Sequence, residues 1–552
     1  MPLQLLEVGP SQNQPGLSKL ACGGKRFVEL PSRSQTRLEV RSLDDLVPPD
    51  AFVRLFDAIL DALDFSAFEA HHPGGGRPAF PPKLLCKLLL YGQCLSVRSA
   101  REVSRRLERD THFMWLAHEV VVDHETLSNF RRAFRKELRR LFKQVARLGV
   151  LLGLASLEHV SLDGTKLAAR AARQAYDEKG LQAALKRIDE RIEKLMDEAE
   201  ALDAAEDVRY GKSRGDEIPE QLQQAEARRE KLQEALQALQ QSEHDYIALG
   251  DFEAPLQKTQ DGKRPGYNGQ LAVDAKVGFV VGEQLVTDQN DTAQFVPLAE
   301  QTVENTGQTP QEFAADSGYH SPETLEALAT PEGAALNAYI NQRRDDKHGH
   351  LGHDAFSYDE ATDSYTCPEG KPLKYRDTKR LGKIDYRRYR AVCSCQDCPR
   401  RASCISEKAR QRELLVSPHE PLLRAMRSKL ATPEGEHALQ LRKQTVERTF
   451  GTMKAQLGLR QFLLRGLEGA QVEFTLCAMA VNVRKLAQWL RTEGSLEQLR
   501  EAAAQVAAAS RFPGLLSGLR RGCQWLTTGH PAPADRTTRA HQPRRATATG
   551  LA

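Results

Sequence analysis

Two aspartates each follow a short apolar stretch, and this pattern constrains the fold most. Apolar residues alternate with polar ones before Asp163 in the segment HVSLDGTKLAA, as they do in a half-buried strand. The segment EFAADSGYHSPETLEAL repeats the arrangement at Asp316, and its Ser321 and Pro322 favour a helix start. Further strands are predicted in GYNGQLAVDAKVGFVVGEQLV and AALNAYIN. Strands separated by helical stretches predict an α/β fold with an aspartate at each of two strand ends.

Residues 41–155 carry the apolar periodicity of helices and predict an all-α N-terminal domain. Ser42 is the expected N-cap of the first helix, and a single long helix is expected over residues 123–152, capped by Asp123 or Thr126. Between residues 98 and 147 there are thirteen Lys and Arg against seven Asp and Glu. This excess indicates a DNA-binding surface that includes Arg131, Arg132 and Arg135, and solvated helix faces are the alternative explanation.

Residues 176–245 contain two stretches with heptad spacing joined by a polar turn. This pattern predicts an antiparallel helical hairpin inserted after the first strand. A solvated strut is as good an interpretation of it as a dimerisation or DNA-clamping arm.

Five cysteines lie within residues 360–412, and they include a CxxC pair. They can supply a tetrahedral thiolate site for structural Zn²⁺ with one cysteine left over, and the alternative is an irregular insertion whose thiols bind nothing. The five are Cys367, Cys393, Cys395, Cys398 and Cys404. The other five cysteines are scattered and are interpreted as packing or surface residues.

The chain has 552 residues, so several folded units are expected. Residues 1–40 and 527–552 have the composition of a flexible leader and a disordered tail. The sequence contains no stretch of eighteen uncharged apolar residues, which predicts a cytoplasmic protein without a membrane segment. A net charge of +4 is only weak evidence for a polyanionic partner.

Glu447 lies in a helical segment whose apolar stripe is Val446, Phe450, Met453 and Leu457, so it points off a different face. Together with Asp163 and Asp316 it would provide three carboxylates, hard oxygen ligands that suit Mg²⁺ or Mn²⁺. Two such ions roughly 4 Å apart would support in-line displacement at phosphorus. Taken singly, each acid is explained equally well as a turn residue or an exposed helix residue.

Three segments resemble the catalytic blocks of bacterial insertion-sequence transposases of the DDE class: SLDGTKLAA, FAADSGYHS and RKQTVERTFGTMKAQLGL. The segment VVDHETLSNFRRAFR resembles the helical N-terminal domain of that family. The family's pattern of arginine, glutamate, FG and lysine can be matched to Arg442, Glu447, Phe450, Gly451 and Lys454. One departure is the segment LGDFEAPLQKTQDGKRPGYN, where relatives show TDP before GYN.

The resemblance implies an RNase H-like mixed sheet flanked by helices over residues 156–490, interrupted by the helical hairpin (176–245) and the cysteine-rich segment (360–412). A C-terminal helical segment (491–526) would follow. It also implies that Asp163, Asp316 and Glu447 are catalytic and hold two Mg²⁺ or Mn²⁺ ions. Lys166, Arg442 and Lys454 would contact DNA phosphates.

The implied reaction is metal-dependent cleavage of the ends of an insertion sequence and transfer of the freed 3′ hydroxyl groups into target DNA. The implied partners are double-stranded DNA and a second copy of the chain, in the cytoplasm at the nucleoid. Two alternatives are a non-catalytic sequence-specific DNA-binding protein and a metal-dependent nuclease that cuts without joining.

Overall fold

The computed structural model describes residues 41–71, 79–171, 175–210, 220–242, 245–259, 262–342, 350–381 and 384–511. The chain divides into two compact units, Met1–Leu46 and Val47–Ala552. In the first, a 3₁₀ turn, η1 (Asp44–Leu46), is closed by the Ser42 amide donating to Asp45 Oδ2 at 2.8 Å. The predicted leader, the tail and residues 512–526 of the C-terminal helical segment lie outside the described residues.

The described residues of the second unit begin with helices, the element type that the apolar periodicity predicts. They are α1 (Phe52–Asp61), α2 (Ser66–Glu69), α3 (Pro82–Cys94), α4 (Ala100–Arg106), α5 (Thr111–Leu116), α6 (His124–Ala133) and α7 (Arg135–Leu151). The first long helix starts at Phe52 instead of Ser42, because Pro48 and Pro49 interrupt the segment. The helix expected over 123–152 is two helices, since Phe134 leaves helical geometry with φ −106° and ψ 34°. Asp123 caps α6 through two backbone amides.

A mixed sheet follows, which confirms an α/β fold. Its strands are β1 (His159–Ala168), β4 (Leu256–Thr259), β5 (Gly262–Asp274), β6 (Phe279–Val286), β7 (Glu312–Ala315) and β8 (Ala338–Ile340). β5 pairs antiparallel with β1, β4 and β6, whereas β7 pairs parallel with β1 and with β8. The central strand β1 therefore has an antiparallel neighbour on one side and a parallel neighbour on the other.

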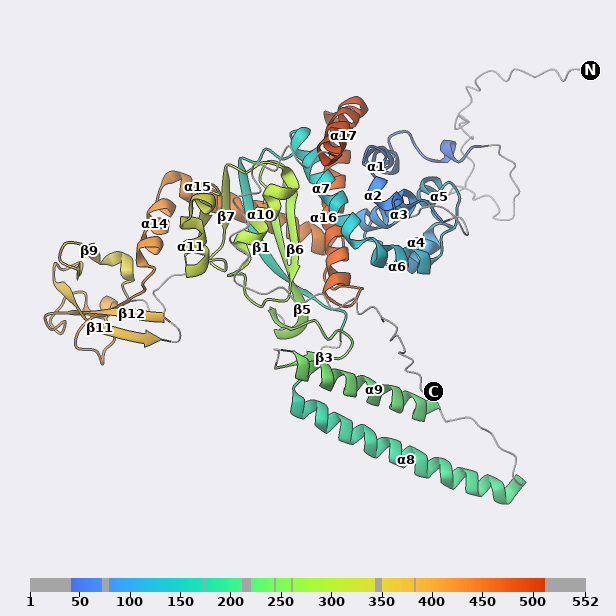
Figure 1. Cartoon of the computed structure of the whole chain (residues 1–552), viewed down its shortest axis with the longest axis horizontal. Helices are drawn as coiled ribbons and strands as arrows, with labels where there is room; N and C mark the ends of the chain where they lie inside the picture. The colour runs from blue at the N-terminus through green and yellow to red at the C-terminus, as the bar shows by residue number, and fades with distance from the viewer. Residues whose placement is uncertain are drawn as a thin grey trace, which may run out of the picture. The chain divides into compact units, whose positions relative to one another are not determined.

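Helices from the C-terminal part of the chain pack against this sheet and against the N-terminal helices (Figure 1). The sheet contacts α10 (Phe295–Thr306), α14 (Glu420–Leu430), α15 (Pro433–Gly451) and α16 (Leu467–Thr492). Among the other helices, α11 (Pro322–Ala329) packs on α10 and α14, α12 (Pro331–Ala334) packs on α11, and α17 (Leu496–Arg511) packs on α7. α16 contacts β6, α3 and α7, and the buried amide of Asn482 bonds both backbone groups of Val280 on β6. α15 crosses β1 and continues into a π-helical turn, η3 (Thr452–Gln456).

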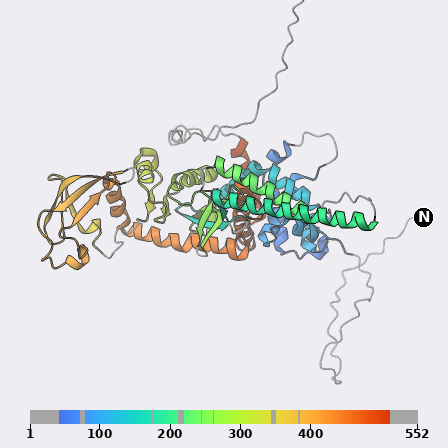
Figure 2. The same cartoon turned by 90° about the horizontal axis from the view of Figure 1, so that it is seen from below.

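The predicted helical hairpin is present. α8 (Glu178–Tyr210) and α9 (Glu220–Gln241) run side by side in Figures 1 and 2. Arg229 bonds Asp189 at 2.6 Å and Gln240 bonds Glu178 at 3.1 Å, a pairing that makes the helices antiparallel. At its base, β2 (Ala175–Tyr176) pairs with β3 (Ile247–Ala248).

The cysteine-rich segment forms a second, antiparallel sheet with its own small core. Its strands are β9 (Ser357–Asp359), β10 (Ser364–Thr366), β11 (Pro372–Leu381), β12 (Ile384–Ala391) and β13 (Glu413–Val416), with η2 (His353–Ala355) before them and α13 (Arg401–Cys404) before β13. Nine buried residues make that core, Tyr365, Leu373 and Tyr389 among them. None of the helices in the described part of the chain combines the length and apolar character that a bilayer-spanning segment needs.

Candidate active site

The prediction that Asp163 ends a strand is wrong, because β1 continues past it to Ala168 in antiparallel pairing with β5. In the parallel pairing of β1 with β7, Leu162 stands opposite Ala315, the last residue of β7. Asp163 and Asp316 are the residues that follow these two, so the two aspartates lie beside each other. The Asp163 carboxylate accepts the Gly164 amide at 2.8 Å, and the Asp316 carboxylate accepts the Gly318 amide at 2.8 Å. The parallel register, which the sequence alone does not reveal, therefore brings together two acids that are 153 residues apart.

Arg442 reaches this position from α15. Its Nη1 atom lies 3.0 Å from Asp163 Oδ2, and both side chains are largely buried. Burial raises the pKa of Asp163 to about 6, Arg442 lowers that pKa, and the nearby Asp316 and Asp291 raise it further. The carboxylates of Asp163, Asp316 and Asp291 repel one another, so a cation bound among them would be stabilised.

Two lysines flank Asp163. Lys454 Nζ donates to Thr165 Oγ1 at 2.5 Å, and Lys166 Nζ lies 3.6 Å from Asp291 Oδ1. Burial lowers the pKa of both lysines, while Asp163 raises that of Lys454 and Asp291 raises that of Lys166. The site thus holds three cationic side chains, Arg442 included, around its carboxylates.

Glu447 is not joined to the two aspartates by any contact among the described residues. It lies on the exposed side of α15, whereas the predicted stripe of Val446, Phe450, Met453 and Leu457 is buried. Lys454 lies beyond the end of α15, in the π-helical turn η3, and reaches Thr165 on β1 from there.

Asp291 is a residue of this site that is not among those predicted from the sequence. This residue follows β6 in the loop before α10, and its Oδ1 atom accepts from Asn268 Nδ2 at 2.6 Å and from Gln270 Nε2 at 2.7 Å. The buried Tyr319 hydroxyl donates in turn to Gln270 Oε1. The polar run DQND after an apolar strand repeats the signal that identified Asp316, so Asp291 could have been predicted from it.

The carboxylates of Asp163 on β1 and Asp316 just after β7 have the donor chemistry that Mg²⁺ or Mn²⁺ requires. Asn268 is fully buried and its Oδ1 atom has no hydrogen-bond partner, so a further oxygen near these carboxylates is unsatisfied. The residues therefore fit a divalent cation. Within the described ranges, no group of three or more His, Cys, Asp or Glu side chains is already gathered closely enough to hold one.

The N-terminal arginines need a correction. Arg131 was expected on the DNA-facing surface, but it is buried, with its Nη1 atom bonding the Arg98 carbonyl and Glu473 nearby. It packs inside because α6 lies against α4 and Arg98. Arg132 is exposed and bonds Asn129, and Arg135 pairs with Glu468 on α16.

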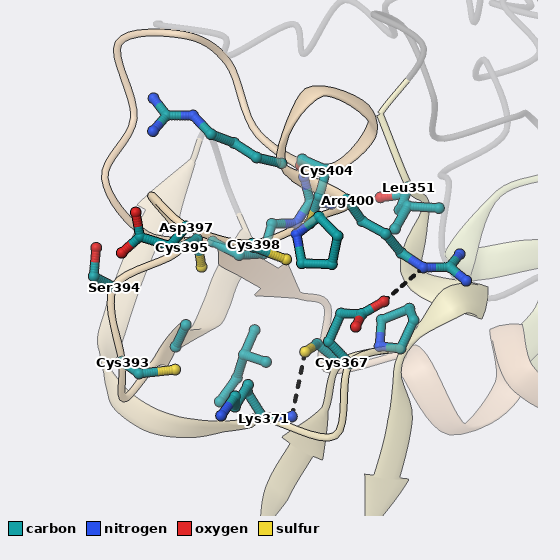
Figure 3. Close-up of a pocket in the computed structure, with 17 residues that line it drawn as sticks. Leu351, Cys367, Lys371, Cys393, Ser394, Cys395, Asp397, Cys398, Arg400 and Cys404 are labelled. Atoms are coloured by element: carbon teal, nitrogen blue, oxygen red, sulfur yellow. Dashed lines mark hydrogen bonds and ion pairs between the residues drawn. The ribbon is translucent and has the colours of Figure 1, made fainter.

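All five cysteines of the second sheet line one cavity as free thiols (Figure 3). Cys367 occupies a tight turn in which the Lys371 amide donates to its Sγ atom at 3.4 Å and Gly370 takes a positive φ of 72°. Burial raises the pKa of Cys404, as do the nearby Cys395, Cys398 and Cys367, while Arg412 lowers it. Cys86, Cys94 and Cys477 are buried packing residues as expected, and Cys22 and Cys523 lie outside the described residues.

Two segments of the chain match known protein families. Residues 366–487 match the family described as Transposase DDE domain, and residues 41–133 match the one described as Transposase domain (DUF772). The first match contains Arg442, Glu447 and Lys454 and begins after Asp163 and Asp316. Comparisons with curated proteins and with solved structures gave no match.

Proposed function

We propose that this chain, which is related to the insertion-sequence transposases of the DDE class, cleaves the ends of its element and joins the freed 3′ hydroxyl groups to target DNA. The observation that carries the proposal is the adjacency of Asp163 and Asp316 on the parallel strands β1 and β7. In the proposed reaction these two residues and Glu447 form the catalytic set.

Asp163 and Asp316 would hold the divalent ions, Mg²⁺ or Mn²⁺. Such ions, when bound, supply Lewis acidity that activates an attacking oxygen and neutralises charge on a leaving oxygen. The chain itself fixes both carboxylates through the amides of Gly164 and Gly318, so that they are oriented before DNA arrives. Arg442 keeps Asp163 more ionised than burial alone would allow.

Lys166 and Lys454 are proposed to bind DNA phosphates at the two sides of Asp163. Their ammonium groups lie next to the reacting centre and are partly desolvated, so a phosphate oxygen there would be strongly attracted. Glu447 is proposed as the third carboxylate because it lies in the segment that matches the family described as Transposase DDE domain, on the same helix as Arg442. Its exposed side chain is free to turn toward DNA-bound ions.

The order of strands supports the proposal that the sheet is RNase H-like. β1 is central, the antiparallel neighbours β5 and β6 lie on one side of it, and β7 and β8, which run parallel to β1, lie on the other. Residues 156–490 would then be the catalytic domain, and 41–155 the DNA-binding domain. The hairpin of β11 and β12 adds a basic surface, with Arg387 lying 4.9 Å from the ring centre of Tyr375. Exposed Lys374, Lys379 and Arg380 on that hairpin suit contact with the DNA backbone.

A joining assay tests the proposal. Duplexes with the DNA that flanks the gene are end-labelled and incubated with Mg²⁺ or Mn²⁺, the protein and an unlabelled target duplex. Label that moves into the target supports a transposase, whereas cleavage without transfer indicates a nuclease. Binding of the ends with neither cleavage nor transfer under either metal indicates a DNA-binding protein and overturns the proposal. In a gel-shift assay at saturating protein, a complex that contains two duplexes reports the expected dimer.

The cysteine cavity is proposed to hold a structural Zn²⁺ ion. A five-stranded sheet with a core of nine buried residues has little apolar area to stabilise it, and a metal is a common substitute. Cys367, Cys395, Cys398 and Cys404 are the proposed ligands, because all four line the cavity and the first three lie close enough to Cys404 to raise the pKa of its thiol. Elemental analysis of the purified protein should give about one zinc per chain, and Cys398→Ser should lose it while Cys393→Ser keeps it.

A further inference from the structure

Asp291 lies close to the other two aspartates of the candidate active site, Asp163 and Asp316. A Cβ atom built on Gly318 would lie 2.9 Å from Asp316 Oδ1 and 3.2 Å from Asp291 Oδ2, so these two carboxylate oxygens approach the same point. Asp291 also raises the pKa of Asp163, which shows that the three carboxylates share one electrostatic environment. The side chain of Asp291 is 22% exposed, which leaves it open to a ligand from solvent.

The surroundings of Asp291 fix its orientation. Its Oδ1 atom accepts hydrogen bonds from the buried amides of Asn268 and Gln270, which leaves Oδ2 to point toward Gly318 and Asp316. Buried amides that hold one oxygen of a carboxylate pre-organise the other for a ligand, because the side chain cannot rotate without breaking two bonds. Such bracing has no purpose in a carboxylate that merely ends a turn.

An independent observation comes from Asn268. The side chain is fully buried, its amide nitrogen is used by Asp291, and its Oδ1 atom has no hydrogen-bond partner. A Cβ atom built on Gly164 would lie 3.1 Å from this oxygen and 2.6 Å from Asp291 Oδ1, so the unsatisfied oxygen points to the same space as the carboxylate. A buried acceptor without a donor is costly, and a cation or its bound water would satisfy it.

We propose that Asp291 is a fourth carboxylate of the catalytic centre and binds a divalent cation together with Asp316. Asn268 holds the side chain of Asp291 in the orientation that this binding needs. This inference rests on the proposed function, because it adds a ligand to the same site. Lys166, at 3.6 Å from Asp291 Oδ1, then supplies the balancing positive charge when no cation is present.

Binding of Mn²⁺ to the full-length protein without DNA tests the inference, with free Mn²⁺ followed by electron paramagnetic resonance. Asp291→Asn keeps the shape and can still accept from both amides, so it removes only the charge. Its affinity for Mn²⁺ should fall at least about tenfold, as should that of Asp316→Asn. The matched control is Asp57→Asn, a 25% exposed aspartate that pairs with Lys87 in the N-terminal helices, and its affinity should not change.

The outcomes separate the inference from the function on which it rests. If Asp316→Asn loses Mn²⁺ and Asp291→Asn binds it like the wild type, the inference is overturned and the proposed function stands. If Asp163→Asn and Asp316→Asn also bind like the wild type, the metal site itself is refuted. A thermal melt of each variant should stay within a few degrees of the wild type, which shows that lost binding is not lost folding.

Discussion

Arg442 Nη1 lies 3.0 Å from Asp163 Oδ2, and this ion pair joins α15 to the end of β1. The two residues are 279 positions apart in the chain. Through this contact the helix that carries Glu447 is tied to the strand that carries Asp163, so the ion pair links the two segments to which the proposed catalytic residues belong.

Replacement of Arg442 by glutamine should weaken metal binding at neutral pH. The pKa of Asp163 is raised to about 6 by burial and is held down by Arg442, so the variant should have a higher pKa and a smaller ionised fraction near pH 6.5. Mn²⁺ affinity at that pH should fall about tenfold and recover by pH 8.5, and Arg442→Lys should restore most of it. An unchanged pH profile would show that Arg442 does not control the ionisation of Asp163.

Replacement of Glu447 by glutamine should abolish cleavage without affecting the fold. The side chain is exposed and makes no hydrogen bond or ion pair among the described residues, so the melting temperature should change little. Cleavage should fall at least about 100-fold, since the site loses a charge that helps to hold the reacting ions. Glu436→Gln, also exposed and on the same helix, should cleave normally; equal activity of the two variants would remove Glu447 from the catalytic set.

Replacement of Glu473 by glutamine should destabilise the protein strongly. Glu473 on α16 accepts from Arg98 Nη2 at 2.6 Å and from the Leu463 amide at 2.8 Å, and the buried Arg131 lies nearby. The variant would leave two buried guanidinium groups without their counter-charge, which costs about 3–5 kcal/mol. Denaturant unfolding measures the change, and a loss below about 1 kcal/mol would mean that water reaches this pair.

Stability should also depend on pH through Glu283. Burial raises its pKa to about 7, above the ordinary value near 4.5, so between these values the folded state binds one proton more than the unfolded chain. Stability therefore falls as the pH rises from 4.5 to 7, by about 3 kcal/mol, and stays low above that range. Glu283→Gln should remove this loss, so that it melts above the wild type at pH 8 by a larger margin than at pH 5.

The residues that could be predicted from sequence are those whose pattern is local. The apolar stretch before each residue identifies Asp163 and Asp316, although β1 continues past Asp163. The proline after Ser321 identifies that residue as a cap, and periodicity identifies the buried face of α15. The Thr324 amide donates to Ser321 Oγ and the two aspartates are adjacent, in agreement with that interpretation.

The residues that could not be predicted depend on contacts between distant segments. Arg131 was placed on the surface because a charged helix residue usually lies there, but Glu473, 342 positions later, stabilises it inside. Asp291 has the same local signal as Asp316, a polar run after an apolar strand, but only the contacts from Asn268 and Gln270 on β5 show that its carboxylate is held in the site. Phe134 was read as part of one long stripe, and its break in the helix reflects packing that overrides propensity.

The most direct test of the central claim compares the wild type with Asp316→Asn for strand cleavage and joining on duplexes that carry the DNA flanking the gene, with Mg²⁺ or Mn²⁺. The variant keeps the shape of the side chain and removes the charge. Cleavage and joining by the wild type, both lost in the variant while DNA binding persists, is the predicted result. Equal cleavage by the two proteins would contradict the assignment of Asp316, and with it the catalytic pair on β1 and β7.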